Sequence, residues 1–307
     1  MIPTLHLAAA MLEVLVVVAS ARWMLSRCTV SVWYRLVVNA ILAIALAGGW
    51  MLVVRVPRFP PMEDFDRILL GVLPLAWMLD VFAPRFGAAA WLLRCLVAAG
   101  AVRLVVHGSQ YVATGQKDAW TTAQSVVHCA GWAIALVVSW WLSALLEVRR
   151  PNFRSAWVVW PAAATSAVAV TLSGYLSCGL ALLLLACAGL AVALTYSTPN
   201  AILRNTSNDA VLWILWMSWL AAAVYFSDMS VYVAISLLAI PSTPWLVAVV
   251  RFPKNYARIQ TALIYSVPIA LCGAILITYL LPLAGTQART PATSAQPNYQ
   301  DYLQFGK

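Results

Sequence analysis

Three of the ionisable side chains that lie in apolar stretches of the sequence are the residues best suited to chemistry. Glu13, Arg103 and His128 each fall within a run long enough to cross a bilayer. A charge in lipid is costly, so such groups often face the protein interior and mark a functional site. By helical rise, Glu13 would lie about 12 Å and His128 about 9 Å from one membrane face. They form a candidate intramembrane polar site that could relay protons or bind a ligand, with hydrogen bonding between helices as the structural alternative.

The three histidines of the chain suggest a second, metal-based hypothesis. His6 would begin the first apolar segment, His107 would end the fourth, and His128 lies early in the fifth. Imidazoles and a carboxylate suit a transition metal, and two histidines could ligate haem. The spacing matches no metal motif, and a histidine at a helix end can simply meet water and headgroups. We therefore predict no cofactor and keep metal or haem at these histidines as an alternative.

Asp80 and Arg94 form a candidate structural ion pair. They lie on consecutive apolar segments joined by a tight turn around residues 84–87, which gives them similar depth. Pairing would lower the cost of burying both charges. The alternative is that either side chain extends to the membrane interface.

The ninth apolar segment contains Pro241 and Pro244 in the stretch AIPSTPWL. Each proline removes a backbone donor and clashes with the preceding turn, so we predict a helix break here. The carbonyl groups left free could coordinate an ion or a substrate, as in transporters. Ser242 and Thr243 could instead donate hydrogen bonds to those carbonyls and leave a plain kink.

These residues must be positioned by membrane-spanning helices, each of which needs about 20 mostly apolar residues. The sequence predicts ten: 5–25, 36–54, 68–83, 88–106, 122–146, 156–174, 177–196, 210–226, 230–250 and 261–284. Nine spans are the alternative, because the third and eighth are short and the fourth contains two arginines. The predicted fold is an all-α integral membrane bundle, with 1–284 as one transmembrane domain and 285–307 as a polar, disordered tail.

The Lys and Arg residues between the predicted spans indicate an orientation. Alternate connections, starting with the first, hold Arg27, Arg35, Arg85, Arg149, Arg150, Arg154, Arg204, Arg251, Lys254 and Arg258. The other connections hold Arg55, Arg58, Arg67 and Lys117. Basic loops stay in the cytoplasm, so the first set is predicted inside and both termini outside.

Composition excludes several classes of protein. Apolar residues make up 63% of the 307 positions and charged residues only 9%, whereas soluble domains have about 25% charged residues. The net charge of +9 comes from basic residues scattered between apolar runs, which is not a nucleic-acid-binding patch. Fifteen tryptophans are present, and Trp213, Trp216 and Trp219 recur every third residue. They predict an interfacial belt or a packing stripe, with a lipid groove or subunit contact as the alternative.

Three classes of function are compatible with these features. The first is a non-catalytic subunit or scaffold of a membrane complex, with the lipid bilayer and partner subunits as its contacts. The second is a transporter of a small or lipophilic solute with its polar site in the first five spans. The third is a metal- or haem-binding membrane protein. No catalytic motif occurs, so an enzyme is disfavoured. The expected location is a bacterial cytoplasmic (inner) membrane.

Overall fold

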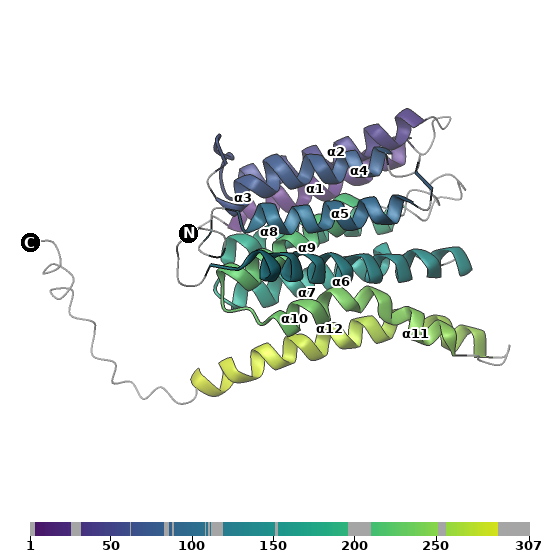
Figure 1. Cartoon of the computed structure of the whole chain (residues 1–307). Helices are drawn as coiled ribbons and strands as arrows, with labels where there is room; N and C mark the ends of the chain where they lie inside the picture. Colours follow the sequence, from purple (N-terminus) through teal and green to yellow (C-terminus); the bar gives the residue numbers. More distant parts are fainter. Residues whose placement is uncertain are drawn as a thin grey trace, which may run out of the picture.

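A computed structural model describes most of the chain. The described residues are 4–25, 32–61, 63–82, 86–87, 89–107, 109, 111, 119–150, 153–195, 210–250 and 256–287. Over these ranges the protein is all-helical and has no strand, and its helices run side by side as a bundle (Figure 1). The greater part of the predicted tail, residues 288–307, lies outside the described residues.

The helices follow the apolar runs of the sequence. Their bounds are α1 Thr4–Leu25, α2 Val32–Val53, α3 Asp64–Arg67, α4 Leu73–Phe82, α5 Ala89–Val105, α6 Thr122–Arg149, α7 Ala156–Leu172, α8 Leu176–Thr195, α9 Ala210–Phe226, α10 Val231–Ala239, α11 Thr243–Val249 and α12 Ala257–Gln287. A π-helical turn, Ile68–Val72, joins α3 to α4, and a 3-10 turn, Ile240–Ser242, joins α10 to α11. Both irregular turns lie at prolines, which cannot donate to the carbonyl four residues back.

Six of the helical segments in the described ranges are long and apolar enough to cross a membrane. They are Leu5–Met24, Leu36–Val53, Thr122–Arg149, Leu176–Thr195, Val231–Val249 and Arg258–Leu281. The prediction of ten spans is therefore not confirmed, although a multi-pass membrane protein is indicated. The helices α7 and α9 are apolar but have only 17 residues each, and α5 carries Arg94 and Arg103 within its 17 residues.

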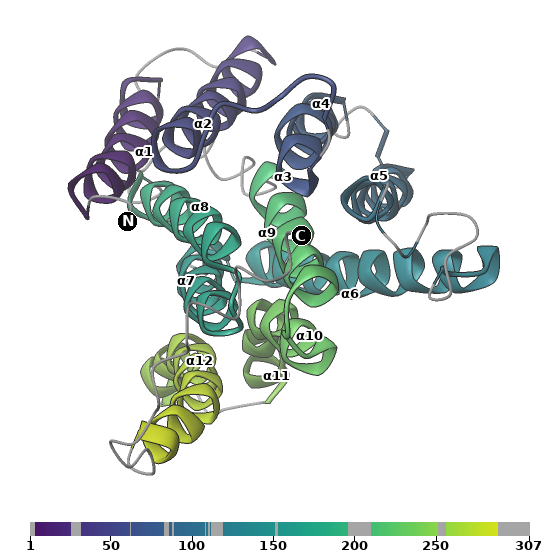
Figure 2. The same ribbon diagram turned by 90° about the vertical axis from the view of Figure 1, so that its left-hand side faces the viewer.

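Two helices, α8 and α9, form the centre of the bundle. Most of α8 is buried, 83% of its apolar span, and nearly every residue of α9 is buried as well. Figure 2 shows α9 within the bundle, and it contacts α4, α5, α6, α7, α8 and α10. A helix that is apolar on every side is expected to be buried in this way, and both sequences meet that description.

The helices α7 and α8 approach most closely at glycines. A methyl group added at Gly179 would lie 2.0 Å from Thr171 Oγ1, and one at Gly189 would lie 3.2 Å from Trp160 Cβ. Small residues let helix backbones approach in lipid, where van der Waals packing drives association. These two glycines therefore fix the α7–α8 pair that supports the centre of the bundle.

Two helices differ from the rest in their setting. Figure 2 shows α6 nearly from its side, so it crosses the bundle obliquely. The helix α12 lies at the edge of the bundle, where it contacts α7 and α11, and only 17% of its apolar span is buried. In Figure 1 α1 begins and α12 ends at the same end of the bundle, which is the end predicted to lie outside.

Candidate functional site

An aromatic cluster joins the predicted outer ends of α6 and α9. The Trp120 and His128 rings stack with centroids 4.4 Å apart, and Tyr225 meets both of these rings nearly edge-on. The Tyr225 hydroxyl accepts a hydrogen bond from Trp132 Nε1 at 2.9 Å and lies 3.3 Å from His128 Nδ1. His128 is thus held by aromatic contacts at the helix junction, although its side chain remains exposed.

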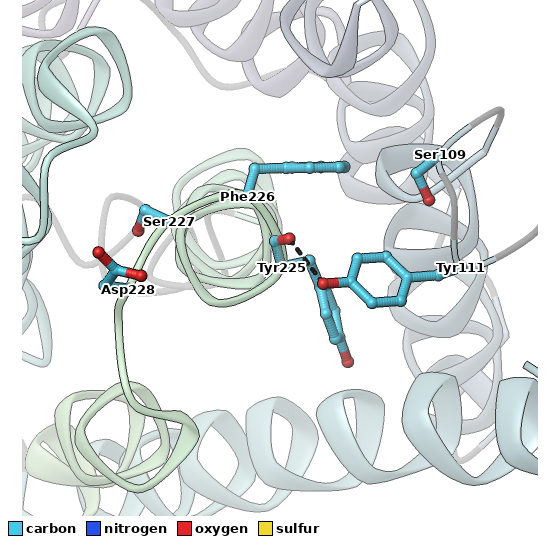
Figure 3. A pocket seen from close by; sticks show the side chains of 6 residues that line it. All are labelled: Ser109, Tyr111, Tyr225, Phe226, Ser227 and Asp228. Atoms are coloured by element: carbon cyan, nitrogen blue, oxygen red, sulfur yellow. Dashed lines mark hydrogen bonds between the residues drawn. The ribbon is translucent and has the colours of Figure 1, made fainter. Parts of the chain in front are cut away.

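A cavity of about 490 Å³ lies beside this cluster, at the end of α9 (Figure 3). It is lined by Ser109, Tyr111, Tyr225, Phe226, Ser227 and Asp228. Tyr111 donates its hydroxyl hydrogen to the Tyr225 carbonyl at 3.1 Å, and Asp228 lies across the end of α9 from this pair (Figure 3). The Ser109 and Ser227 hydroxyls each donate to a backbone carbonyl. Among the described lining residues, no nucleophile is paired with a base.

Glu13 lies on α1, where it faces α2 and is half-buried. A methyl group added at Gly48 would lie 3.3 Å from Glu13 Oε1, so the glycine leaves room for the carboxyl group. The other oxygen, Oε2, is buried and has no hydrogen-bond partner. A buried polar atom without a hydrogen-bond partner is uncommon in folded proteins and calls for an explanation, such as a functional role.

The three residues of the predicted polar site are not brought together. Glu13 is on α1, which packs mainly against α2 and α8, whereas Arg103 is on α5 and His128 is on α6. Figure 2 shows α1 on the opposite side of the bundle from α5 and from the outer end of α6. Arg103 is exposed, as is His128. A single site that uses all three side chains therefore has no support in the fold.

The metal hypothesis also fails to gain support from the geometry. His6, His107 and His128 are all exposed. Over the described parts of the chain, no three His, Cys, Asp or Glu side chains are grouped as metal ligands. The alternative of a metal or haem held by these three histidines therefore gains no support from the described residues.

Asp80 has a role that the sequence did not indicate. Its carboxylate accepts hydrogen bonds from the backbone N–H groups of Ala210, at 2.7 Å, and Val211, at 3.3 Å. These N–H groups belong to the first turn of α9, which has no partners for them within the helix. The negative charge also suits the positive end of the α9 dipole. Asp80 on α4 therefore caps the central helix of the bundle.

Arg94 is buried between two tryptophan rings. Its guanidinium carbon lies 4.2 Å from the centre of the Trp91 ring and 4.5 Å from that of Trp140. Aromatic faces attract a cation, and the Asp80 carboxylate attracts this one from further away. Arg94, the predicted partner of Asp80, is therefore close enough for electrostatic attraction to that carboxylate. Its guanidinium group contacts the Trp91 and Trp140 rings.

The proline segment of the ninth predicted span is stabilised by neighbouring hydroxyl groups. Pro244 cannot donate to the Ile240 carbonyl, and the Thr243 hydroxyl donates to that carbonyl instead, at 2.7 Å. Ser143 of α6 donates to the Pro241 carbonyl at 2.8 Å. The carbonyls around the break thus have donors from the protein, which leaves a kink rather than an open ion site.

The recurrent tryptophans of α9 are buried packing residues. Trp213, Trp216 and Trp219 are each at most 3% exposed. Trp216 Nε1 donates to the Ser166 hydroxyl at 3.0 Å, and Trp213 stacks on Trp140 with centroids 6.0 Å apart. These three rings therefore fill the interior and are not available to a lipid or a partner subunit.

A polar network that the sequence did not predict lies at the outer end of α3. Arg55 pairs with Glu63 at 2.8 Å and with Asp66 at 3.0 Å, and Asp66 is almost fully buried. Burial would raise the pKa of Asp66, but the hydrogen bonds and charge of Arg55 outweigh it, so the pKa is lowered. Burial raises the pKa of Asp64, although a 2.5 Å hydrogen bond from the Tyr175 hydroxyl opposes that rise. The only sign of this network in the sequence is the acidic run 63–66 just before the third predicted span.

The described interior holds polar groups that mostly join one helix to another. Among the groups described in this section, Glu13 and the outer cavity are those that could act on another molecule. Comparison with known proteins adds no function, because no protein family, characterised protein or solved structure matches the chain.

Proposed function

We propose that this chain is a multi-pass protein of a bacterial cytoplasmic membrane that serves as a non-catalytic subunit or scaffold of a membrane complex. The proposal includes ten crossings with both termini outside. The helices α3 and α4 are joined by the turn at 68–72, and α10 and α11 by the turn at 240–242. If each joined pair is counted as one helix, the described residues form ten helices. The shorter and more polar helices would then cross the bilayer shielded from lipid by the six long apolar helices.

The observation that carries a scaffold role is the structural use of the interior polar groups. Asp80 caps α9, Arg94 lies between two indole rings, and Ser143 supports the helix break. The two central helices are packed with large apolar side chains. An interior built in this way favours rigidity over the passage of a solute, and its lipid-facing helices are free to hold a neighbour.

The edge helix α12 is the surface that we propose for a partner subunit. Its exposed apolar side chains include Ile269, Ile277 and Leu281, at 56%, 56% and 66%. A lone helix at the edge of a bundle can bury a further face against another membrane helix. A partner there would contact α12, whose apolar span is 17% buried, rather than α2, whose apolar span is 44% buried.

The test is photo-crosslinking in the native membrane. A photoreactive amino acid is placed at Ile269 or Ile277 of α12, with Ile44 of α2, which is 70% exposed, as the control position. A scaffold is expected to give one protein adduct of constant mass from both α12 positions, with the partner copurifying in stoichiometric amount. Adducts to lipid alone at all three positions, and a chain that elutes alone in mild detergent, would contradict the proposal.

A transporter coupled to protons is the second candidate, and Glu13 favours it. Its Oε2 atom is buried without a hydrogen-bond partner, and carboxyl groups within membrane-spanning helices often mark the path of a proton or an ion. Glu13→Gln should abolish proton-dependent solute flux in proteoliposomes if this function is correct. A scaffold should keep the activity of its complex nearly unchanged by the same substitution, which separates the two candidates.

A further inference from the structure

Arginines from two helices far apart in the sequence lie at the predicted inner end of the bundle. Arg149 and Arg150 end α6, and Arg258 lies in the first turn of α12. The guanidinium of Arg149 lies over the Trp245 ring of α11, 4.6 Å from its centroid. We call Arg149, Arg150, Arg258 and Trp245, together with Gln260, the inner arginine cluster.

Gln260 holds the elements of this cluster together. Its side chain is buried and accepts a hydrogen bond from Arg150 Nη2 at 2.6 Å. Its amide nitrogen donates to the carbonyls of Val247, at 3.2 Å, and Val250, at 3.0 Å. One glutamine thereby joins the end of α6, the end of α11 and the start of α12, so the segments that carry the three arginines lie next to one another.

The carboxylates of the described residues form no ion pair with Arg149, Arg150 or Arg258, the arginines of this cluster. The nearby Glu147 directs one carboxylate oxygen to the Ser155 N–H at 2.7 Å. Two further features favour an anion. The first turn of α12 holds no acidic residue, and its N–H groups carry the positive end of the helix dipole.

An apolar surface adjoins these charges on the lipid side. Leu246 and Val249 of α11 are 69% and 59% exposed, and Ile259 of α12 is 50% exposed. A phosphate group bound by arginines with hydrocarbon chains on the adjoining apolar surface is the arrangement of a phospholipid. A tryptophan beside the charged groups suits the same interface, because its ring is both apolar and a hydrogen-bond donor.

We propose that the inner arginine cluster binds the headgroup of an anionic phospholipid of the inner leaflet. The guanidinium groups of Arg149, Arg150 and Arg258 would donate hydrogen bonds to the phosphate oxygens, which favour planar N–H forks. The acyl chains would lie on α11 and α12. This inference rests on the membrane insertion proposed above and is independent of a scaffold or transport role.

The experiment measures thermal unfolding of the full chain in mild detergent with added lipid. Phosphatidylglycerol is expected to raise the Tm by about 2–4 °C more than phosphatidylcholine does, since a ligand of the folded state stabilises it. The double variant Arg149→Gln/Arg258→Gln should lose most of that difference. Arg103→Gln, which removes an exposed arginine at the other end of the bundle, should keep it.

Further arms make each result decisive. Arg149→Lys/Arg258→Lys keeps the charge and should retain part of the lipid effect, which separates lost binding from a damaged fold. If the glutamine variant does not fold, native mass spectrometry compares how much phosphatidylglycerol the lysine variant and the wild type retain. Equal retention would show that the guanidinium groups are not required and would contradict the proposed binding mode. An equal effect of phosphatidylcholine, or full replacement of the lipid by inorganic phosphate, would overturn the proposal of an anionic phospholipid.

Discussion

The buried carboxylate of Asp66 links the stability of the outer end to pH. Its pKa is lowered by Arg55, so its ionised form stabilises the fold above the ordinary value of about 3.8, and this contribution is lost as the pH falls through the lowered pKa. Asp66→Asn should therefore cost about 1–3 kcal/mol near pH 7, because the buried partners lose a charged acceptor. The difference from the wild type should shrink toward pH 3 in thermal unfolding measurements.

Asp64 provides a contrast of opposite sign two residues earlier. Burial raises its pKa, so stability is present while it is protonated and is lost as the pH rises through that raised value. Asn keeps an acceptor for the Tyr175 hydroxyl without the charge. Asp64→Asn should therefore leave stability near pH 7 unchanged or slightly higher. A loss as large as that of Asp66→Asn would contradict this account of the two carboxylates.

Asp80 can be tested as a helix cap against its predicted role as an ion-pair partner. Asp80→Ala leaves two N–H groups of α9 without acceptors and should cost about 1–3 kcal/mol. Asp80→Asn keeps an acceptor oxygen and should recover part of that loss, although the attraction to Arg94 disappears in both variants. Equal destabilisation by Asn and Ala would instead make the charge of Asp80 its main contribution. Denaturation of the purified protein in detergent measures both.

The sequence predicted the intramembrane position of these residues but not their partners. The depth of Asp80 and Arg94 follows from counting residues along adjacent helices, and their mutual attraction follows from that depth. The cap on α9 joins residues 130 positions apart, and helical periodicity carries no information on such a contact. Glu13 and His128 were predicted to share a site because they lie at similar depth in the membrane. Depth alone does not show where each helix lies around the bundle, and the fold places these two residues apart.

At the scale of the elements, the α7–α8 pair depends on Gly179. A methyl group there would overlap Thr171 Oγ1 and would lie 2.9 Å from the Ala167 carbonyl oxygen, which is backbone and cannot rotate away. Gly179→Ala should therefore destabilise the protein by about 1–3 kcal/mol. Gly131→Ala in α6 is the matched control, since nothing lies within 4 Å of the added group. A neutral Gly179→Ala would show that the helices separate easily.

The type and bounds of most elements could be predicted, because a spanning helix is a long apolar run. The predicted segments 122–146 and 177–196 correspond closely to α6 and α8. The irregular turns were harder. Two prolines indicated the break at Ile240–Ser242, whereas the π turn at Ile68–Val72, next to Pro74, was read as regular helix. Which helix lies in the centre was not predicted either, although the all-round apolar sequences of α8 and α9 could have indicated it.

At the scale of the whole molecule, the orientation in the membrane remains a prediction from the basic residues. If ten lengths cross the bilayer, the start of α6 faces outward and the start of α12 faces inward. Thr122 and Arg258 mark these positions, and both are exposed. Single cysteines at Thr122 and Arg258 therefore report on opposite faces, and most of the native cysteines in the described chain are buried.

Intact spheroplasts treated with a membrane-impermeant maleimide should label Thr122→Cys and leave Arg258→Cys unlabelled until the membrane is permeabilised, with the unmodified chain as the blank. The reverse pattern would invert the bundle and move the inner arginine cluster to the outer leaflet. Labelling of both positions in intact spheroplasts would mean an even number of crossings between them, whereas five helical lengths separate them in the proposed topology. In that case one of the shorter helices, α7 or α9, does not span the bilayer, and the count of nine becomes the better description.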